Sequence, residues 1–456
     1  MSRAALHIND AGIVLLDAKQ ILYRQPGVAL LGDDGVVTGN PAFAASRINP
    51  RRVQHRYWSE LSVEPLAEQL FSRLSAADLV SAQLEHLWQS AATDIDELVI
   101  AVPPSMNADT LGLLLGIAAE LKLPVMALVD SAVAATRREY RDAALVHIDI
   151  GLHSTTLTRL SQSGQVQAER TEVLGDFGIY ALFDTWLTGI AEAFVQQSRF
   201  DPLHTAETEQ QLLDRLGGWL AAAGRSETVA LSLEAGSMTY DAEIESLSLI
   251  GAVAPRYQQI ANRLRALCRA DETPALQVTD RVARLPGLTA MLKARVGGEV
   301  YVLEPGATAR GALARCRSQA TSSQGVSLLR QLPWDQSAIR LEPDASEAQH
   351  AGVPTHILHG DIAYGINESP LLFGSQPDDS GRIVPLQDEM PGLSRRHCTV
   401  RLANGQCIVE DHSRYGTFLN GHRIDGSTVL QVGDSLRIGT PGFEFRLITM
   451  DESHEA

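Results

Sequence analysis

Two short segments pair an aspartate with a glycine in a way that suits binding of a phosphorylated ligand. Asp10 precedes Gly12 and Asp149 precedes Gly151, and an apolar, strand-like run leads into each aspartate. A hairpin of this kind turns backbone N–H groups toward a phosphate, while the aspartate holds a hydrated metal ion. One such pair is a weak signal, but two of them predict a phosphate-binding site. The alternative is that both aspartates only cap turns.

The region that carries these segments alternates strands and helices. A β-rich run at 98–102 ends at two prolines, and residues 108–121 then place leucine and alanine at the 3.6-residue spacing of a helix with one buried face. A second strand is predicted at 125–129 and a second helix at 132–140. Strand, helix and strand in this order predict an α/β domain with a largely buried sheet over residues 1–318.

The chain changes character beyond this region. Residues 319–353 are rich in small and polar side chains, which predicts a linker. From 354 to 450, short alternating runs are separated by Asn-Gly and Asp-Gly pairs, which supply the positive φ angles of tight hairpin turns. This pattern predicts an all-β sandwich of short strands, followed by an acidic tail over 451–456.

Composition limits the classes of function. The 456 residues carry 38 Lys and Arg against 55 Asp and Glu, a formal net charge of −17, which disfavours non-specific binding to nucleic acid or to an anionic membrane. The four cysteines form no Cys-x-x-Cys pair, which argues against a zinc site or a disulfide scaffold. The first residues do not resemble a leader, and apolar runs stay shorter than about 18 residues, so we expect a cytoplasmic protein.

Residues 1–318 resemble the actin-like ATPases, most closely the nucleotide-binding domain of DnaK-type heat-shock chaperones. The resemblance rests on both Asp-x-Gly segments and on further segments in the same order, namely 49–50, 99–107, 128–135, 174–177, 284–288 and 304–312. It implies a two-lobed α/β fold with a nucleotide cleft. The peptide-binding β-domain and the helical lid of that family have no counterpart in the sequence.

The positions that would hold the nucleotide depart from the family pattern. Ile13 and Val14 replace the hydroxyl residues of the first phosphate loop, and Trp58 replaces the catalytic lysine. Leu152 and His153 replace glycines of the second loop, and Asp280 and Arg281 replace the paired glycines of the adenosine loop. The helix that grips adenine corresponds to the mostly small residues of 218–225. Each missing hydrogen bond is worth roughly 1–3 kcal/mol, so we expect no ATP turnover and no catalytic residues.

Three carboxylates of the family pattern remain. They are Asp10, Asp130 and Asp149, and Gly12 and Gly151 follow two of them. We interpret these five residues as a vestigial nucleotide or metal site, with no resident metal and no cofactor. The alternative is residual binding of Mg-ATP, with the carboxylates holding the metal ion.

Residues 354–450 resemble a forkhead-associated (FHA) domain, a β-sandwich that reads phosphothreonine peptides through its apical loops. The landmarks are 373–375, 393–397, 411–421 and 432–439. The resemblance implies a protein partner that a serine/threonine kinase has phosphorylated on threonine. Such a phosphate dianion is complemented by hydroxyl and guanidinium donors.

Four residues carry over from the family pattern to this site. Ser394 matches the phosphate-binding serine, and Arg395 follows it as a further cation. His397 matches a histidine that braces the loop in the family, and we predict this structural role rather than ligand contact. Gly374 permits the sharp turn of the preceding loop.

Two positions of the site depart from the pattern. Ser375 stands where the family has an arginine, and Tyr415 stands where it has an asparagine. Their absence predicts weaker recognition by roughly 2–4 kcal/mol if nothing compensates. Arg414 is a candidate substitute cation, the alternative being an ordinary solvated arginine, and Tyr415 is a candidate for stacking on a peptide side chain.

Three hypotheses of function follow. The first is an interaction protein, in which a chaperone-like pseudo-ATPase domain carries an FHA domain that binds a partner, either through phosphothreonine or independently of phosphate. The second is a divergent ATPase whose nucleotide state regulates FHA-mediated binding. The third is a purely structural role with both sites inactive. Trp58, Asp280 and Arg281 favour the first and third over the second.

Overall fold

The computed structural model divides the chain into two compact units, residues 1–337 and 338–456. The structure describes residues 2–32, 35–67, 73–91, 95–269, 271–316, 326–335, 353–359, 362–375, 382–386, 393–403, 405–414, 416–419, 422–424, 426–432, 434–439 and 443–448. Each of the sheets lies within one of the two units.

The first large sheet of the N-terminal unit has the strand order β3-β2-β1-β7-β8-β16. These strands are β1 (Arg3–His7), β2 (Ile13–Leu16), β3 (Ile21–Gln25), β7 (Glu97–Val102), β8 (Val125–Asp130) and β16 (Leu328–Leu329). The first three form an antiparallel meander, whereas β7 is parallel to β1 and β8 is parallel to β7. A parallel pair needs a crossover connection, and α3 (Ala108–Glu120) provides it between β7 and β8.

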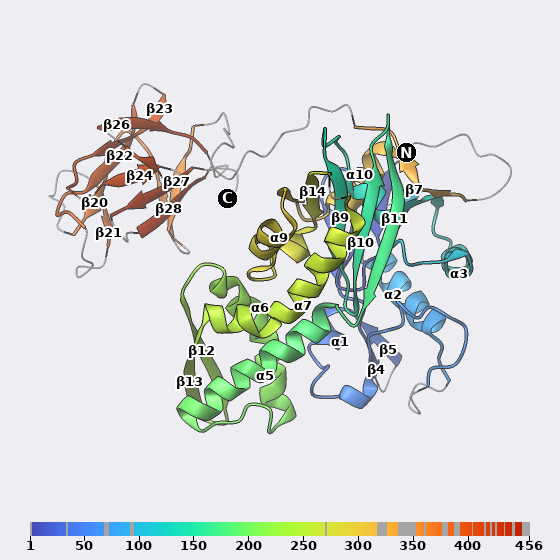
Figure 1. Cartoon of the computed structure of the whole chain (residues 1–456). Coiled ribbons are helices and arrows are strands. Elements are labelled where there is room, and N and C mark those ends of the chain that lie inside the picture. The colour runs from blue at the N-terminus through green and yellow to red at the C-terminus, as the bar shows by residue number, and fades with distance from the viewer. Residues whose placement is uncertain are drawn as a thin grey trace. The chain divides into compact units, whose positions relative to one another are not determined.

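The second large sheet repeats this order as β11-β10-β9-β14-β15, with β17 added beside β11. The strands are β9 (Ala144–Ile150), β10 (Ser154–Ser161), β11 (Val166–Gly175), β14 (Pro274–Val278), β15 (Glu299–Val302) and β17 (Gln331–Leu332). Again the first three are antiparallel and the next two are parallel (Figure 1). Asp10 lies in the hairpin β1–β2 and Asp149 lies at the end of β9, so each sheet carries its Asp-x-Gly segment at the same place.

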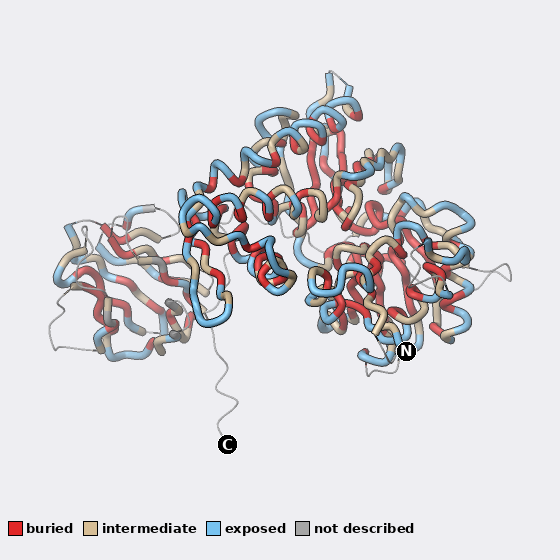
Figure 2. The backbone as a smooth tube through the Cα atoms, turned by 90° about the horizontal axis from the view of Figure 1, so that it is seen from below, coloured by how far each residue is buried: buried red, intermediate tan, exposed pale blue. Residues whose placement is uncertain are grey.

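Helices pack against both sheets, and the central strands β1, β7 and β9 are buried, within the unit's buried interior (Figure 2). The largest apolar cluster joins the second sheet to α5 (Ile179–Ser198), α6 (Ala206–Ala223) and α7 (Ser246–Leu267), and it includes the fully buried Trp186. A second cluster packs α2 (Ala76–Ser90) and α3 against the first sheet. Ser75 begins α2 with a capping box that it shares with Asp78.

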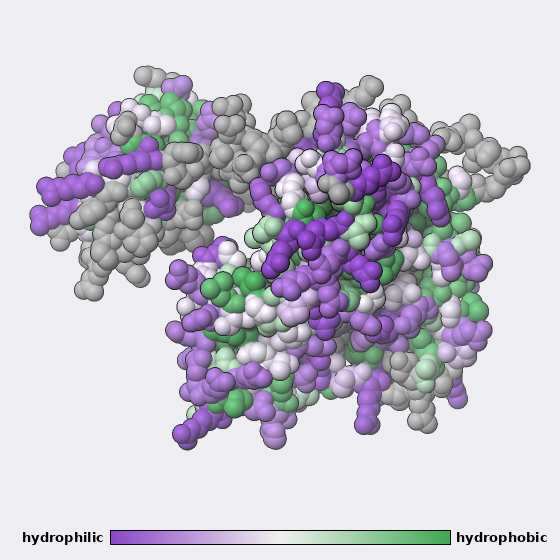
Figure 3. Space-filling view, viewed as in Figure 1, coloured by the Kyte–Doolittle hydropathy of each residue, from purple (hydrophilic) through white to green (hydrophobic). Residues whose placement is uncertain are grey.

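Smaller elements complete the unit. They are β4 (Ala29–Gly32), β5 (Gly35–Thr38), α1 (Asn40–Phe43), the 3-10 turn η1 (Pro50–Arg52), β6 (Val53–Gln54), α4 (Ser131–Ala135), β12 (Thr228–Ala235), β13 (Met238–Glu245), α8 (Asp280–Ala283), α9 (Leu288–Val296) and α10 (Ala307–Arg315). Most of the face that Figure 3 shows is hydrophilic, with apolar side chains in separate small patches.

The helix predicted at 132–140 is shorter in the structure. It ends at Ala135, and Thr136 adopts an extended backbone. The buried Arg315 guanidinium donates hydrogen bonds to the carbonyl oxygens of Val133 (2.8 Å) and Thr136 (2.7 Å), so these carbonyls are satisfied without further helical turns. The partner that ends the helix is 179 residues away and leaves no local signal.

Part of the expected linker belongs to the N-terminal unit. Residues 326–335 fall inside the predicted range of 319–353, yet β16 pairs with β8 at the edge of the first sheet and β17 pairs with β11 at the edge of the second. Leu332 is buried, and Asp335 accepts a hydrogen bond of 2.9 Å from Arg137 Nε. Two open sheet edges thus order a segment whose composition alone is that of a linker.

The C-terminal unit is β-rich and fits the predicted sandwich. Its strands are β18 (His356–His359), β19 (Ile362–Gly365), β20 (Leu371–Gly374), β21 (Arg382–Pro385), β22 (Cys398–Ala403), β23 (Gln406–Asp411), β24 (Thr417–Leu419), β25 (His422–Arg423), β26 (Ser427–Leu430), β27 (Ser435–Ile438) and β28 (Phe443–Ile448). They form two sheets, β19-β18-β28-β27-β24-β25 and β21-β20-β22-β23-β26. Phe373 and Phe445 meet edge to face in the core, with ring centroids 5.1 Å apart.

None of the described helices is long and apolar enough to cross a membrane.

Candidate functional site

Two loops of the C-terminal unit meet at Ser394. This residue lies between β21 and β22, and Arg414 lies between β23 and β24. The backbone N–H of Arg414 donates a hydrogen bond of 3.1 Å to Ser394 Oγ. Because the hydroxyl oxygen accepts this bond, its own hydrogen is free to be donated to a ligand.

His397 connects the same two loops through hydrogen bonds of its imidazole ring. Its side chain is fully buried, Nδ1 accepts a hydrogen bond from the Ser394 N–H (3.0 Å), and Nε2 lies 3.1 Å from the Gly416 carbonyl oxygen. These partners require a neutral imidazole with its proton on Nε2. Burial lowers the pKa of His397, although its bond to the Gly416 carbonyl works in the opposite direction. His397 therefore positions the Ser394 loop and is shielded from a ligand.

Gly374 lies directly under the Ser394 loop. A Cβ atom at this position would collide with the Arg395 carbonyl, so only glycine fits between β20 and the loop. The next residue, Ser375, donates its N–H to the Ser394 carbonyl oxygen at 3.1 Å. The Ser375 backbone thus supports the loop, and its short side chain replaces the expected arginine.

Sequence reasoning missed the residues that shape the second loop. Asp411 Oδ1 accepts hydrogen bonds from the Ser413 N–H (3.0 Å) and the Thr417 hydroxyl (2.8 Å). Ser413 Oγ in turn accepts the Gly416 N–H at 2.8 Å, and Gly416 has a φ of 89°. The aspartate two residues before a serine is the signal that could have indicated this turn.

The cations of the site stand at its surface. The side chains of Arg395 and Arg414 are exposed, and neither has an ion pair within the described residues. Tyr415, the predicted stacking residue, lies outside the described residues. The described site therefore consists of one directed hydroxyl group and two exposed guanidinium groups on loops that buried hydrogen bonds hold in place.

Comparison with known protein families decides the nature of this unit. The model of the FHA domain family matches residues 372–439. Residues 372–439 form an FHA domain. The match indicates a protein-interaction role of the phosphopeptide-binding type, and it includes every residue predicted for this site. No curated protein matches the chain.

The N-terminal unit, which lies outside the FHA match, brings its two Asp-x-Gly hairpins into direct contact. Asp10 Oδ1 accepts the Leu152 N–H at 2.7 Å, so the first hairpin occupies an amide that a phosphate would need in the second. A Cβ atom on Gly151 would collide with the Asp10 carboxylate. The carbonyl of Gly12 faces Arg281, whose Nη2 lies 3.5 Å away. The two hairpins thus bind each other.

Asp149 is a buried carboxylate that the protein itself satisfies. Its Oδ1 accepts the Thr279 hydroxyl (2.7 Å), its Oδ2 accepts the Asn9 amide (2.8 Å), and the Arg281 guanidinium lies 3.8 Å from Oδ1. Burial alone would raise the pKa of Asp149, but the Arg281 charge and smaller contributions outweigh it and lower the pKa. His7 lies 4.0 Å from Oδ2 and stays neutral, because burial and Arg281 lower its pKa to about 3.

Asp130 lies apart from this pair. It ends β8 and caps α4, with Oδ1 accepting the N–H groups of Ala132 (2.9 Å) and Val133 (3.2 Å). It lines a different cavity from the hairpins. The described residues contain no group of three or more His, Cys, Asp or Glu side chains that could hold a metal ion. The structure therefore brings together Asp10 and Asp149 of the three predicted carboxylates, and it leaves Asp130 outside.

Aromatic rings pack together beside the second hairpin. The His55 and His153 rings stack with centroids 4.9 Å apart, and Tyr180 lies 4.8 Å from His55. Trp58 is buried and donates its indole N–H to Gln83 Oε1 at 2.7 Å. Trp58 therefore belongs to the core of the unit and has no donor left for a phosphate.

Asp10 provides a test of this contact between the hairpins. Burial raises the pKa of Asp10 to about 6, and asparagine keeps the Oδ1 acceptor while removing the charge. Because the raised pKa makes the ionised form costly above about pH 6, we expect Asp10→Asn to increase the free energy of unfolding by about 1–3 kcal/mol near pH 7.5. The gain should shrink as the pH falls toward about 4, where the native carboxyl is protonated. Urea unfolding at both pH values measures it, with the exposed Asp271→Asn as a neutral control.

Proposed function

We propose that the protein is an interaction protein whose FHA domain binds a partner phosphorylated on threonine, and whose N-terminal unit is a pseudo-ATPase scaffold. The observation that carries the proposal is the Ser394 hydroxyl group, which Arg414 N–H and His397 fix at the apex of the FHA domain. The oxygen accepts inside the protein, and the hydrogen is left for the ligand.

Charge supports the choice of a phosphorylated ligand. The chain has a formal net charge of −17, yet Arg395 and Arg414 expose two guanidinium groups beside Ser394. A phosphate dianion offers three acceptor oxygens, and hydrogen bonds between charged groups are about twice as strong as neutral ones. Arg414 supplies the cation that Ser375 lacks, because its backbone is already bonded to Ser394.

Titration of the full chain with matched phosphothreonine and unmodified peptides tests the proposal. We expect the phosphorylated peptide to bind more tightly, and Ser394→Ala to weaken its binding by about ten- to a hundredfold, the loss of one hydrogen bond to a charged group. Ser427→Ala, an exposed serine at the start of β26, is the matched control. Equal affinity for both peptides would instead support binding that does not depend on phosphate.

For the N-terminal unit we infer an actin-like, DnaK-type fold that no longer uses nucleotide. The support is the strand order that occurs twice, with an Asp-x-Gly segment at the same place in each sheet. The groups that would meet phosphate and metal are engaged within the protein: the Leu152 N–H binds Asp10, and Asp149 is paired with Arg281. Direct contact between the hairpins thus replaces the ligand.

Thermal unfolding with Mg-ATP distinguishes this inference from a divergent ATPase. A ligand that binds only the folded state at a hundred times its Kd adds about 2.7 kcal/mol, which moves Tm by several degrees. We expect no shift at about 5 mM Mg-ATP. A shift that Asp149→Asn abolishes would restore the hypothesis of a nucleotide-regulated protein.

A further inference from the structure

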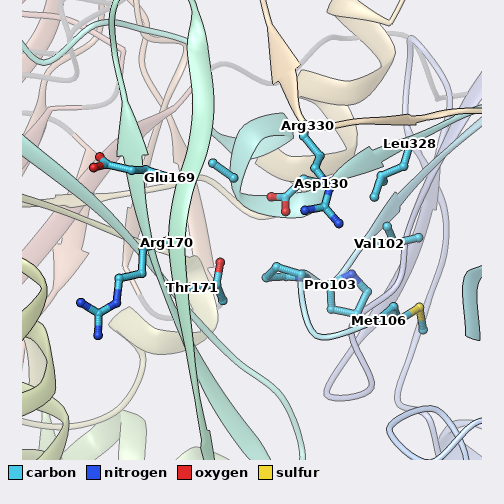
Figure 4. A pocket seen from close by; sticks show the side chains of 11 residues that line it. Val102, Pro103, Met106, Asp130, Glu169, Arg170, Thr171, Leu328 and Arg330 are labelled. Carbon is cyan, nitrogen blue, oxygen red and sulfur yellow. The ribbon is translucent and has the colours of Figure 1, made fainter. Parts of the chain in front are cut away.

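A cavity of about 190 Å³ lies between the two sheets of the N-terminal unit, next to the segment 326–335. Strand β11 provides one wall through Thr171, and the ends of β7 and β8 provide the other through Val102 and Asp130. Leu328 of β16 and Arg330, which lies between β16 and β17, also border it (Figure 4). Segments far apart in the chain thus converge on one small space.

One oxygen of the Asp130 carboxylate is left for a ligand in this cavity. The residue is 7% exposed, and both hydrogen bonds of its capping role go to Oδ1. Oδ2 has no partner within the described residues. Burial raises the pKa of Asp130, although the N–H groups of Val133 and Ala132 and the Arg330 charge act in the opposite direction. A ligand that donates a hydrogen bond to Oδ2 would offset the cost of burying this carboxylate.

Arg330 offers the opposite charge. Its guanidinium group is exposed and makes neither a hydrogen bond nor an ion pair with the described part of the chain. Figure 4 shows this guanidinium and the Asp130 carboxylate turned toward each other. Arg330 acts electrostatically on Asp130, yet the two groups do not approach within the 4.0 Å of an ion pair. An anionic and a cationic group therefore face one space without neutralising each other by contact.

In the second cavity of the unit, the arginine side chains are already paired. This cavity measures about 340 Å³ and lies beside His55, His153 and Tyr180. Arg47 is paired with Asp184 at 2.8 Å and with Glu209 at 3.2 Å, and Arg56 is paired with Glu60 at 3.5 Å. Because a ligand gains little from charges that are already paired, the smaller cavity is the better candidate for a binding site.

We propose that the smaller cavity binds a small zwitterion, an α-amino acid with an aliphatic side chain. Asp130 Oδ2 accepts hydrogen bonds from the ammonium group, and the Arg330 guanidinium donates to the carboxylate. Val102, Met106 and Leu328 form the apolar surface for the side chain. The volume is below the roughly 300–1,000 Å³ of sites for drug-sized ligands, which limits the ligand to this size.

Calorimetric titration of the full chain with L-leucine tests the proposal. Leucine methyl ester lacks the carboxylate, and 4-methylpentanoate lacks the ammonium group. We expect leucine to bind with a Kd below about 10 mM, and each analogue to bind at least tenfold more weakly. If the ester binds as well as leucine, the site accepts a cation such as a partner's lysine side chain, and the zwitterion is wrong. The absence of leucine binding at this concentration also overturns the proposal.

Two substitutions connect binding to the cavity without threatening the fold. Asp130→Asn retains an Oδ1 acceptor at the start of α4, where asparagine caps as well as aspartate. Arg330→Gln changes an exposed side chain. Each should weaken leucine binding at least tenfold, whereas Lys122→Gln, at an exposed position just beyond α3 and outside the cavity lining, should leave it unchanged. Unchanged affinity in both cavity variants, with normal thermal unfolding, would place leucine elsewhere and refute the assignment.

Discussion

Replacing Arg281 with methionine is expected to lower the free energy of unfolding of the N-terminal unit by about 3–5 kcal/mol. The Arg281 side chain is 12% exposed and lies 3.8 Å from Asp149 Oδ1, whose side chain is 7% exposed. Methionine fills much of the same volume, but it leaves the Asp149 carboxylate charged and without its cation. All five tryptophans, at positions 58, 88, 186, 219 and 334, belong to this unit, so tryptophan fluorescence in urea reports its unfolding specifically.

Two controls separate the buried pair from a general loss of charge. Adding Asp149→Asn to Arg281→Met removes the stranded charge, and we expect it to recover part of the lost stability. Lys293→Met breaks an exposed pair with Glu299 at 3.0 Å and should cost about 0–1 kcal/mol. If Arg281→Met is as mild as Lys293→Met, the guanidinium does not have the role assigned to it between the hairpins.

His397→Ala is expected to weaken phosphopeptide binding by at least tenfold, although the side chain does not reach a ligand. The substitution deletes the acceptor of the Ser394 N–H and the partner of the Gly416 carbonyl, and it opens a cavity in a fully buried place. Each polar group left unsatisfied costs about 1–3 kcal/mol, so the loops that carry Ser394 and Arg414 lose their fixed separation. Calorimetric titration gives the affinity, and amide hydrogen exchange across 393–419 gives the order of the loops.

His412 provides the matched comparison. It is exposed on the same loop, and its Nε2 lies 3.2 Å from Thr399 Oγ1. His412→Ala should change stability by less than about 0.5 kcal/mol and leave peptide affinity intact. If His397→Ala has normal affinity while exchange across 393–419 is faster, binding does not depend on the alignment of the loops.

The candidate residues of the FHA domain could be named from the sequence because their signals are local. Gly374, Ser394 and His397 stand in short motifs, and their roles follow from glycine geometry and hydrogen-bonding chemistry over a few residues. The bond from Arg414 N–H to Ser394 Oγ was not foreseeable, because it joins two loops that meet only after the sandwich folds. Because that bond occupies one acceptor position of the Ser394 oxygen, it limits the directions in which the hydroxyl hydrogen can point.

In the N-terminal unit the sequence by itself determined the alternation of strands and helices and the two Asp-x-Gly hairpins, since periodicity and turn chemistry act over a few residues. It also indicated that residues such as Trp58 and Arg281 do not suit a nucleotide. Only the tertiary structure decided which groups the two hairpins contact. Asp10 meets Leu152 and Arg281 meets Asp149 across separations of 142 and 132 residues, and contacts at such separations leave no pattern in a local stretch of sequence. For the same reason, the local sequence did not show that residues 326–335 pair with two open sheet edges. It also did not show that Asp130 and Arg330 line one cavity.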